Sequence, residues 1–423
     1  MQPRGIFAVT ILAALSLLPG SAAGASEHSA IEDRTREVLP ANDGWAASGA
    51  GTTGGSAATS MTVVHNRDEL AAAVAGDAPK IVLISGVIEG PSCEGLADPA
   101  YSLQAFLAAY DPAVWGRTNP SGPLEEARLR SVANQRALTE IKVGPNTTIY
   151  GLEGATLRRL TLMIDRAPNV IVRQLRLEDA ADCFPRWSPT DGSAGNWNSE
   201  YDLISVRRST NVWIDHNTFS DGSNPDSAQP VYFGRPYQVH DGALDITHTS
   251  DLATVSWNVF TNHDKTMLIG SSDTVGPDVG KLRVTLHHNV FDGVIQRAPR
   301  VRFGQVDLYN NYFNVRAPHD YSVGIGIQSA VYMENNYFRL RDGITLDRVL
   351  KDWRGTVLTE IGTWARSDDA LPQRVSALAA YNAVNDPDFG PDAGWTPVLR
   401  AHDPLPAPAV PFVTSLLAGA GGH

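Results

Sequence analysis

The sequence predicts an all-β fold, a parallel β-helix, and three observations lead to this prediction. First, from about residue 80, short runs of β-branched residues recur between Asn, Asp and Gly, as in NVWIDHNTF, RVTLHHNVF and VYMENNYF. Second, an Asn recurs near the end of five such runs, with spacings of 41, 31, 22 and 25 residues: Asn217, Asn258, Asn289, Asn311 and Asn336. Third, 43% of the 423 residues are hydrophobic and 19% are charged, which suffices for a large buried core.

The shortest spacing, 22 residues, has the length of one triangular coil. Three strands of about 4–5 residues and three turns of about 2–4 residues add up to roughly that number. Such coils stack, bury a continuous apolar interior, and allow equivalent Asn side chains to bond to one another in a ladder. A β-propeller needs blades of about 40–50 residues, and a leucine-rich repeat needs a Leu spacing that the chain lacks. The repeats favour one domain, which we place at residues 61–423.

The N-terminus has the pattern of a secretory signal peptide over residues 1–25. Arg4 precedes an apolar stretch from Ile6 to Leu18, and Ala23-Gly24-Ala25 forms a small-residue cleavage site. The apolar stretch is too short for a helix that spans a bilayer, so we expect a secreted, extracellular protein without a membrane partner. Residues 26–60, which include AASGAGTTGGSAATS, are expected to form a flexible arm.

The open ends of a β-helix expose sheet edges that need covers. A helix near residues 68–75, with Asn66 as N-cap and Glu69 three residues later, is expected to cover the N-terminal end. Residues 100–141 carry Ala, Leu, Glu and Arg at helical spacing, and we expect them to form an insertion. After about residue 340 the repeat fades, so we expect an irregular segment that packs outside the coils and ends in a partly loose tail.

Charge and cysteine content limit the classes of function. Lys and Arg total 34 against 46 Asp and Glu, a formal net charge of −12, and basic runs are short. We therefore expect no nucleic-acid partner, because phosphate neutralisation requires clustered cations. An anionic substrate would need a local cationic site or a bridging metal ion. The two cysteines, Cys93 and Cys183, could form a disulfide after export, and two independent buried thiols are the alternative.

Two carboxylates in Asp241-Gly242-Ala243-Leu244-Asp245 form the first candidate site. In an extended strand they would lie about 13 Å apart, too far to share a calcium ion, which binds oxygen at about 2.3–2.6 Å. A turn that begins at Asp241-Gly242 would bring them together, and Asp202 could join from the preceding coil. Oxygen ligands without Cys or a His motif suit calcium rather than zinc. Ordinary turn chemistry is the alternative for this pattern.

The second candidate site is basic. Arg297, Arg300 and Arg302 lie in the segment QRAPRVR, where Pro299 interrupts strand pairing, and Lys265 adds a cation from a neighbouring coil. A solvated basic face is the alternative for either segment alone. Acidic and basic clusters at similar points of successive coils indicate one composite groove. The histidines of the repeats lie in neither an HExxH motif nor a nucleophile elbow, so we expect structural roles for them: His216, His263, His287 and His288.

Four segments in this order resemble the pectate lyases of polysaccharide lyase family 1: WIDH (213–216), DGALDIT (241–247), HDKTMLIGSSD (263–273) and RAPRVRFG (297–304). FPRWSPTDGSAGNWNSEYD (184–202) is similar to the secreted bacterial branch of that family. The specific matches cover residues 183–315, and the repeat pattern extends the resemblance over about 61–340. The resemblance implies a right-handed parallel β-helix that cleaves α-1,4-polygalacturonate by calcium-dependent β-elimination to 4,5-unsaturated oligogalacturonides. The several disulfides of some relatives cannot be assumed for this chain, because it has two cysteines.

The resemblance also implies roles for single residues. Arg297 would abstract the proton from C5 of a galacturonate, and Lys265 and Arg302 would hold substrate carboxylates. The implied calcium ligands are Asp202, Asp241 and Asp245, and Asp191 would help to bind further calcium ions when substrate is present. Calcium and the flanking cations would stabilise the negative charge that develops on the substrate carboxylate. We expect the protein to act as a monomer.

Three other functions are alternatives at this point. A pectin lyase acts on methyl-esterified substrate without calcium, which the retained aspartates and the cationic cluster disfavour. A polygalacturonase of β-helix fold would need several carboxylates around an attacking water and no essential arginine. A non-catalytic, calcium-stabilised binding module would not need the cluster around Arg297. An assay for unsaturated products that absorb ultraviolet light separates these functions.

Overall fold

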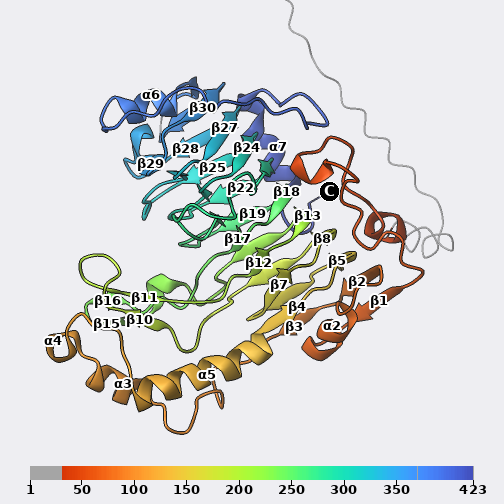
Figure 1. Ribbon diagram of the computed structural model, residues 1–423. Coiled ribbons are helices and arrows are strands. Elements are labelled where there is room, and N and C mark those ends of the chain that lie inside the picture. Colours follow the sequence, from red (N-terminus) through yellow and green to blue (C-terminus); the bar gives the residue numbers. More distant parts are fainter. Residues whose placement is uncertain (1–30, 369, 423) are drawn as a thin grey trace, which may run out of the picture.

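The computed structural model describes residues 31–368 and 370–422. The expected signal peptide, residues 1–25, and the start of the expected arm, residues 26–30, lie outside the described residues. The described chain winds through successive coils, and most coils add one strand to each of three largely parallel sheets, which we call sheets A, B and C (Figure 1). The all-β parallel β-helix predicted from the sequence is confirmed.

Each of the three sheets runs the length of the coils, with its strands paired in the following order. Sheet A consists of β1 (Met61–Val64), β2 (Lys80–Ile84), β5 (Thr147–Gly151), β8 (Val170–Arg173), β13 (Thr210–Asp215), β18 (Asp251–Ser256), β21 (Val284–His287), β24 (Gln305–Tyr309), β27 (Ala330–Glu334) and β30 (Leu358–Ile361). Sheet B consists of β3 (Val87–Glu89), β6 (Thr156–Arg158), β9 (Arg176–Glu178), β14 (Thr218–Ser220), β19 (Val259–Thr261), β22 (Val290–Asp292), β25 (Tyr312–Val315), β28 (Tyr337–Leu340), β31 (Trp364–Ser367) and the antiparallel β32 (Gln373–Arg374). Sheet C consists of β4 (Glu140–Lys142), β7 (Thr161–Asp165), β12 (Ile204–Arg207), β17 (Leu244–Thr247), β20 (Leu268–Ile269), β23 (Arg300–Val301), β26 (Val323–Gly326) and β29 (Leu350–Trp353).

Helices and two hairpins lie outside these sheets. The α-helices are α2 (Arg67–Ala73), α3 (Leu103–Ala109), α4 (Pro112–Trp115), α5 (Pro123–Thr139), α6 (Ala377–Asn382) and α7 (Val410–Leu417). The 3-10 helices are η1 (Trp45–Ala47), η2 (Asp226–Ala228), η3 (Leu346–Arg348) and η4 (Ala407–Ala409). The hairpins are β10 (Arg186–Ser188) with β11 (Asn196–Asn198), and β15 (Val231–Tyr232) with β16 (Arg235–Pro236). No helix of the described chain is long and apolar enough to cross a membrane.

The interior of the coils contains the predicted Asn ladder. Each of the first four Asn donates through Nδ2 to Oδ1 of the Asn in the next coil at 3.0–3.1 Å, in the order Asn217, Asn258, Asn289, Asn311 and Asn336. All five side chains are buried. A stack of phenyl rings runs beside the ladder with centroids 4.5–5.1 Å apart: Phe219, Phe260, Phe291, Phe313 and Phe338. These distances follow from a strand spacing of about 4.8 Å, so the register of the coils sets both stacks.

The N-terminal end of the coils is covered by α2, as predicted (Figure 1). The Asn66 side chain accepts hydrogen bonds from the backbone N–H groups of Asp68 and Glu69 and so caps the helix. Leu70 and Val74 are fully buried in the main core. The helix therefore closes the apolar interior at the edge where stacking begins.

Residues 31–60 pack on the outside of sheet A, and in this they differ from the flexible arm that the composition predicts. Backbone N–H groups of this segment donate to threonine side chains of the sheet. A methyl group at Gly44 would lie 2.6 Å from Thr254 Oγ1, and one at Gly55 would lie 1.9 Å from the Lys80 carbonyl oxygen. The small residues are therefore required for close approach to the sheet, and for this segment the prediction of flexibility is wrong.

The coils continue one turn beyond residue 340, where the sequence predicts their end. Strands β29, β30 and β31 form this further coil, in which buried Thr363 precedes Trp364 as Asn336 precedes Tyr337. The repeat fades in the sequence because the Asn signal stops one coil before the strands do. Helix α6 then packs against the end of the main core through Ala377, Leu378 and Tyr381.

The C-terminal tail runs back along the outside of the coils and is not loose. Trp395 Nε1 donates to the Ala330 carbonyl at 2.9 Å. Farther along, Gly419 N donates to the Trp257 carbonyl at 2.7 Å. The packing outside the coils is as expected, whereas the expected loose tail is wrong for the described residues.

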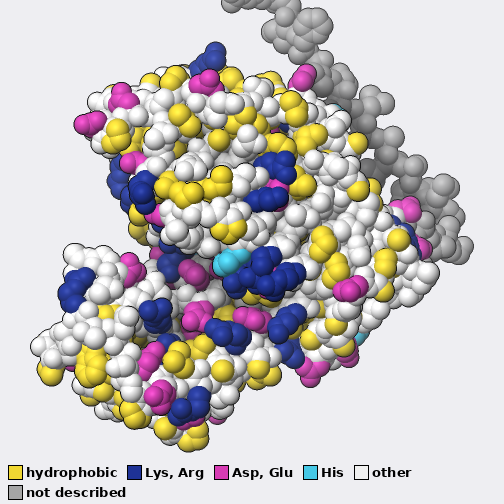
Figure 2. Space-filling model, in the orientation of Figure 1, with side chains coloured by type: hydrophobic (Ala, Val, Ile, Leu, Met, Phe, Trp, Pro, Cys, Tyr) yellow, Lys and Arg dark blue, Asp and Glu magenta, His cyan; other side chains and the backbone are white. Residues whose placement is uncertain are grey.

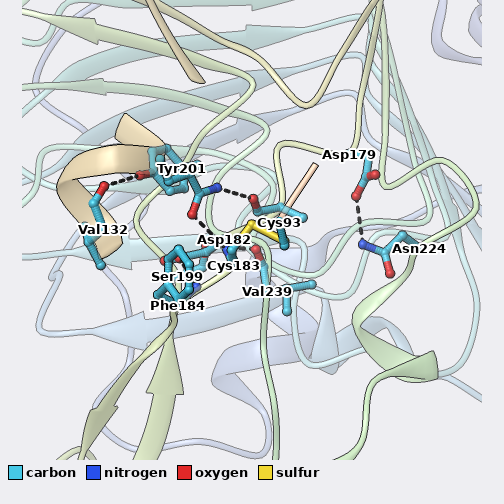
Figure 3. Close-up of a disulfide and its surroundings, with 12 residues drawn as sticks. Cys93, Val132, Asp179, Asp182, Cys183, Phe184, Ser199, Tyr201, Asn224 and Val239 are labelled. Atoms are coloured by element: carbon cyan, nitrogen blue, oxygen red, sulfur yellow. Dashed lines mark hydrogen bonds between the residues drawn. A yellow bond between two sulfur atoms is a disulfide. The ribbon is translucent and has the colours of Figure 1, made fainter. Parts of the chain in front are cut away.

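A side lobe flanks the coils and has its own aromatic core. It comprises α3–α5 and the two hairpins (Figure 1), and its buried core residues are Phe106, Tyr110, Trp187, Trp197, Tyr237 and Val239. The insertion predicted over residues 100–141 supplies the three helices. A disulfide joins Cys93 to Cys183 at the base of the lobe, next to Asp182 (Figure 3), so the alternative of two free thiols is wrong.

Candidate active site

An open groove of about 780 Å³ runs along the outer face of sheet C. One wall comes from the side lobe, through Arg136 of α5 and Glu200 after β11. Figure 2 shows that Lys, Arg, Asp, Glu and His side chains gather in the hollow between the side lobe and the coils. The groove is thus strongly polar, whereas the opposite face of the same sheet packs in the apolar core.

The groove floor is one part of a row of outward-facing side chains on neighbouring strands of sheet C, and the members that line the groove are Lys142, Met163, Ser205, Asp245 and Leu268. Ser205 pairs with Asp245, Leu268 with Arg300, and Arg300 with Gly324. Alternate residues such as Ile204 and Val301 point inward and are fully buried. In strand order the row consists of Lys142, Met163, Ser205, Asp245, Leu268, Arg300, Gly324 and Lys351.

The predicted acidic residues Asp202, Asp241 and Asp245 come together in the groove. Strand β17 begins only at Leu244, and the preceding turn brings the two ends of the motif together, as the sequence requires for a shared site. Gly242 N donates to Asp202 Oδ1 at 2.9 Å. A methyl group at Gly242 would lie 2.4 Å from Asp245 Oδ1 and 2.7 Å from Asp202 Oδ1, so both oxygens face the same small space.

The three carboxylates repel one another in a buried setting. Asp202 and Asp245 are each 8% exposed. Burial and the negative charge of Asp241 raise the pKa of Asp245 to about 7. Burial, together with Asp245 and Asp241, raises the pKa of Asp202 well above its ordinary value. A cation at this point would relieve the repulsion.

These residues fit a calcium ion, which prefers carboxylate and water oxygens. Asp202 and Asp245 direct oxygens to one place, while Asp241 Oδ1 is turned toward Lys265 Nζ at 3.3 Å. Among residues 31–368 and 370–422, no three acidic or imidazole side chains surround a single point as metal ligands. Asp202 and Asp245 are therefore the primary candidate ligands, and Asp241 lies beside them.

The predicted basic residues lie on the same face of the coils. Lys265 is 6% exposed, and its backbone bridges Gly242 and Gln296 in the neighbouring coils. Arg297 follows Gln296, and its carbonyl accepts a hydrogen bond from Met267 N at 2.7 Å. The Arg297 guanidinium is close enough to Asp245 to lower the pKa of that carboxyl against the larger effects that raise it. The predicted acidic and basic residues thus lie together in one composite site.

The arginines of this site differ in how they are held. Arg302 donates through Nε to Asp273 and through Nη1 to the Gly270 carbonyl. Arg297 Nε is buried and has no hydrogen-bond partner among the described residues. Arg302 is therefore fixed in position before any ligand arrives, whereas Arg297 has free donor capacity.

His263 has the structural role expected of the repeat histidines, but it lies beside the acidic cluster, a position that was not predicted. Its Nε2 donates to the Asp241 carbonyl at 2.8 Å, and its Nδ1 lies against Asp221. Burial disfavours the charged imidazole, but the Asp221 carboxylate outweighs burial and raises the pKa of His263. His263 therefore supports the turn that carries Asp241. The sequence feature that could have indicated its position is that it directly precedes Asp264-Lys265.

The other repeat histidines have structural surroundings, as predicted. His216 and His288 stack on Trp257, and His287 stacks on Tyr309. None of the three lines the groove: His287 is the last residue of β21 in sheet A, and His216 and His288 directly follow β13 and β21.

Asp191 is not joined to the acidic cluster. It is exposed on the turn between β10 and β11, where its side chain accepts a long hydrogen bond of 3.4 Å from Asn198. The structure brings Asp202, Asp241, Asp245, Lys265, Arg297 and Arg302 to one groove, and leaves Asp191 on the side lobe.

Comparisons with known proteins agree with this geometry. A family model described as Pectate lyase matches residues 117–381. The pectate lyase of Bacillus subtilis (strain 168) is 41% identical over 388 residues, which cover 87% of this chain and 89% of the relative. The solved structure of the thermostable pectate lyase PL 47 has a TM-score of 0.90 and 42% identity, covering 92% of this chain and 99% of that one. A pectate lyase bound to a hexasaccharide has a TM-score of 0.86 and 40% identity over the same shares. The chain therefore belongs to the pectate lyase family and is an enzyme of that class.

Proposed function

We propose that this enzyme cleaves α-1,4-polygalacturonate by calcium-dependent β-elimination and releases 4,5-unsaturated oligogalacturonides, with Arg297 as the base. The observation that carries the proposal is the position of Arg297. Its guanidinium lies near the buried carboxylate of Asp245, yet its Nε has no partner among the described residues. A related pectate lyase has been solved with a hexasaccharide bound, which supports an oligosaccharide substrate.

Asp202 and Asp245 would hold the calcium ion, and Asp241 would join them. When bound, calcium supplies positive charge against the substrate carboxylate and stabilises the charge that develops there. In the elimination the C5–H proton passes to Arg297, the C5 electron pair forms the C4=C5 double bond, and the C4–O4 bond breaks. The leaving oxygen takes a proton from water.

Arginine is an unusual base, because a free guanidinium has a pKa above about 12. The Arg297 Nε is not engaged by a carboxylate of the described chain. Arg302 and Lys265, by contrast, already contact Asp273 and Asp241. We infer that Lys265 and Arg302 bind substrate carboxylates and that alkaline pH favours the proton transfer.

The experiment is an ultraviolet assay of unsaturated products from polygalacturonate and from highly methyl-esterified pectin, each with calcium and with a chelator. We expect activity on polygalacturonate with calcium and almost none with chelator.

Lys265→Ala and Arg302→Ala should each reduce activity on the unesterified polymer far more than on the esterified one, since each loses a charge-assisted contact worth about 1.5–3 kcal/mol. Arg339→Ala, an outward arginine of β28, is the matched control. Calcium-independent cleavage of esterified pectin would contradict the proposal.

We also propose that the protein is secreted and acts as a monomer. The Cys93–Cys183 disulfide supports export, because disulfides persist in oxidising compartments. Detection of the protein in the culture medium and size-exclusion chromatography test the two statements.

A further inference from the structure

Arg300 lies in the outward-facing row of sheet C, between Leu268, which lines the groove, and Gly324. It is 9% exposed, nearly the same as Arg302 and Asp245 at 8%. Its Nε is buried without a hydrogen-bond partner among the described residues, and its Nη2 lies 3.9 Å from Asp273 Oδ1, too far for a hydrogen bond. Arg300 is thus a largely buried cation whose donors are not satisfied by a carboxylate of the described chain.

An aromatic ring holds the Arg300 side chain in place. The guanidinium carbon lies 3.8 Å from the ring centroid of Trp353. A methyl group at Gly324 would lie 2.9 Å from Trp353 Cδ1 and 3.2 Å from Arg300 Cγ, so the glycine lets both side chains lie flat on the sheet. Stacking on a ring fixes the guanidinium plane without using its N–H groups. The donors remain available to a ligand.

A free Nε is not special by itself. Arg339, on the outside of sheet B, also has a buried Nε without a partner among the described residues. Arg300 differs because it lies in the same outward-facing row as Asp245 and because two cations, Arg302 and Arg297, lie near it. Burial and the positive charges of Arg302 and Arg297 lower the pKa of Arg300 to about 10. A bound anion would offset this repulsion.

We propose that Arg300, stacked on Trp353, binds a further carboxylate of the polygalacturonate chain, beyond the galacturonate that reacts at Arg297. This inference rests on the proposed function. Arg300 lies two strands from Asp245 along the outward-facing row, which corresponds to about 10 Å at the usual strand spacing. A ligand anchored at the acidic cluster therefore has to extend over Leu268 and β23 to reach it. Arg300 would accordingly favour long substrates over short ones.

The test measures binding by calorimetry in the presence of calcium, using digalacturonate and hexagalacturonate as ligands. The Arg297→Lys background is used because it retains the charge and should not consume the ligand. Adding Arg300→Gln should weaken hexagalacturonate roughly tenfold or more and digalacturonate less than about threefold. Arg339→Gln is the matched control and should change neither affinity. In an otherwise wild-type chain, Arg300→Gln should also shift which bonds of hexagalacturonate are cleaved.

Circular dichroism and thermal unfolding establish that the variants are folded. Where Arg300→Gln does not fold, Arg300→Lys replaces it, since lysine retains the charge but loses the planar fork; hexagalacturonate should again weaken selectively. Equal losses for both ligands would overturn the proposal and assign Arg300 to the electrostatics of the reaction site. Unchanged binding of hexagalacturonate would make the Trp353 stack purely structural. Failure of the proposed function is distinguishable, because the wild-type chain would then release no unsaturated product.

Discussion

The Asn ladder and the groove floor are built on the same coils, yet they treat polar groups in opposite ways. In the ladder, Asn289 Nδ2 donates to Val255 O and Asn311 Oδ1, and Asn289 Oδ1 accepts from Asn258. In the groove, the buried carboxylates of Asp202 and Asp245 repel each other. The Arg297 Nε has no partner at all among the described residues.

The difference separates groups that stabilise the coils from groups that the coils hold in place. A buried amide with all its hydrogen bonds strengthens the stack and sets its register. Like charges held together and unpaired donors destabilise the fold, and they are typical of sites that await a ligand. Substitutions in the ladder should therefore change stability, and substitutions in the groove should change activity.

The largest expected effect is on the groove side of this comparison. Arg297→Lys retains the charge but places nitrogen differently, so turnover on polygalacturonate should fall by roughly 10²–10⁴-fold, as for loss of a general base. The unfolding temperature and the affinity for hexagalacturonate should change little. Initial rates and calorimetry measure both quantities, with Arg339→Lys as the control. Turnover within about threefold of wild type would remove Arg297 from the role of base.

On the ladder side, Asn289→Ala should lower the free energy of unfolding by about 3–5 kcal/mol, since it removes buried hydrogen bonds to polar groups of three neighbouring residues. Those groups are the Asn258 amide, the Val255 carbonyl and the Asn311 amide oxygen. At temperatures well below unfolding, kcat/KM should stay close to wild type. Denaturant unfolding and the product assay check the two statements. A variant with lost activity and normal stability would break the distinction between the two regions.

A carboxylate in the side lobe sharpens the comparison, because it is buried like the ladder and ionisable like the groove. Asp182, which lies beside Phe184 (Figure 3), accepts hydrogen bonds from the backbone N–H groups of Phe184 and Glu200. Burial nevertheless raises its pKa to about 7 from 3.8. The folded state thus favours the protonated form, so the contribution of Asp182 to stability is greatest below about pH 4 and declines as the pH rises toward 7.

Asp182→Asn should remove this pH dependence. Relative to wild type, the variant should gain about 2–4 kcal/mol of unfolding free energy between roughly pH 4 and pH 7, on top of a constant offset from the changed hydrogen bond. Denaturant unfolding at several pH values measures the difference. A constant difference across this range would show that Asp182 is ionised in the folded protein at low pH.

The Asn ladder and the groove also differ in how much of each could be predicted from the sequence. The ladder was predictable because a repeated Asn leaves a regular spacing, and the prediction of the last coil failed where Thr363 stands in place of an Asn. The packing of segment 31–60 was not predictable. Small residues such as Gly55, which approaches the Lys80 carbonyl closely, give this segment the same composition as a flexible arm.

In the groove, the residue types and the motif order were predictable, whereas the contacts were not. Asp202 and Gly242 are 40 residues apart, and only the strand register places them at hydrogen-bond distance. The same holds for Arg300 and Trp353, which meet because a glycine occupies the strand between them. Residue spacing along the chain does not encode such contacts between coils.

The smallest effect expected of a substitution is at the metal site, and it tests whether the acidic cluster serves binding or acid–base chemistry. Asp245→Asn retains the size of the side chain, and its Oδ1 can still accept the hydrogen bond from Leu268 N, but one ligand charge is lost. Calcium affinity should fall roughly tenfold, and excess calcium should partly restore turnover. Chelation of the wild type should abolish activity and leave the far-ultraviolet circular dichroism almost unchanged, because a stacked solenoid is stabilised coil against coil. Calorimetric titration with calcium supplies the affinity, with the exposed Asp342→Asn as control.

A carboxylate that acted as the catalytic base would behave differently, since added metal does not replace a proton transfer. A folded Asp245→Asn variant that binds calcium normally and stays inactive at saturating calcium would therefore exclude the ligand role and place Asp245 in acid–base chemistry.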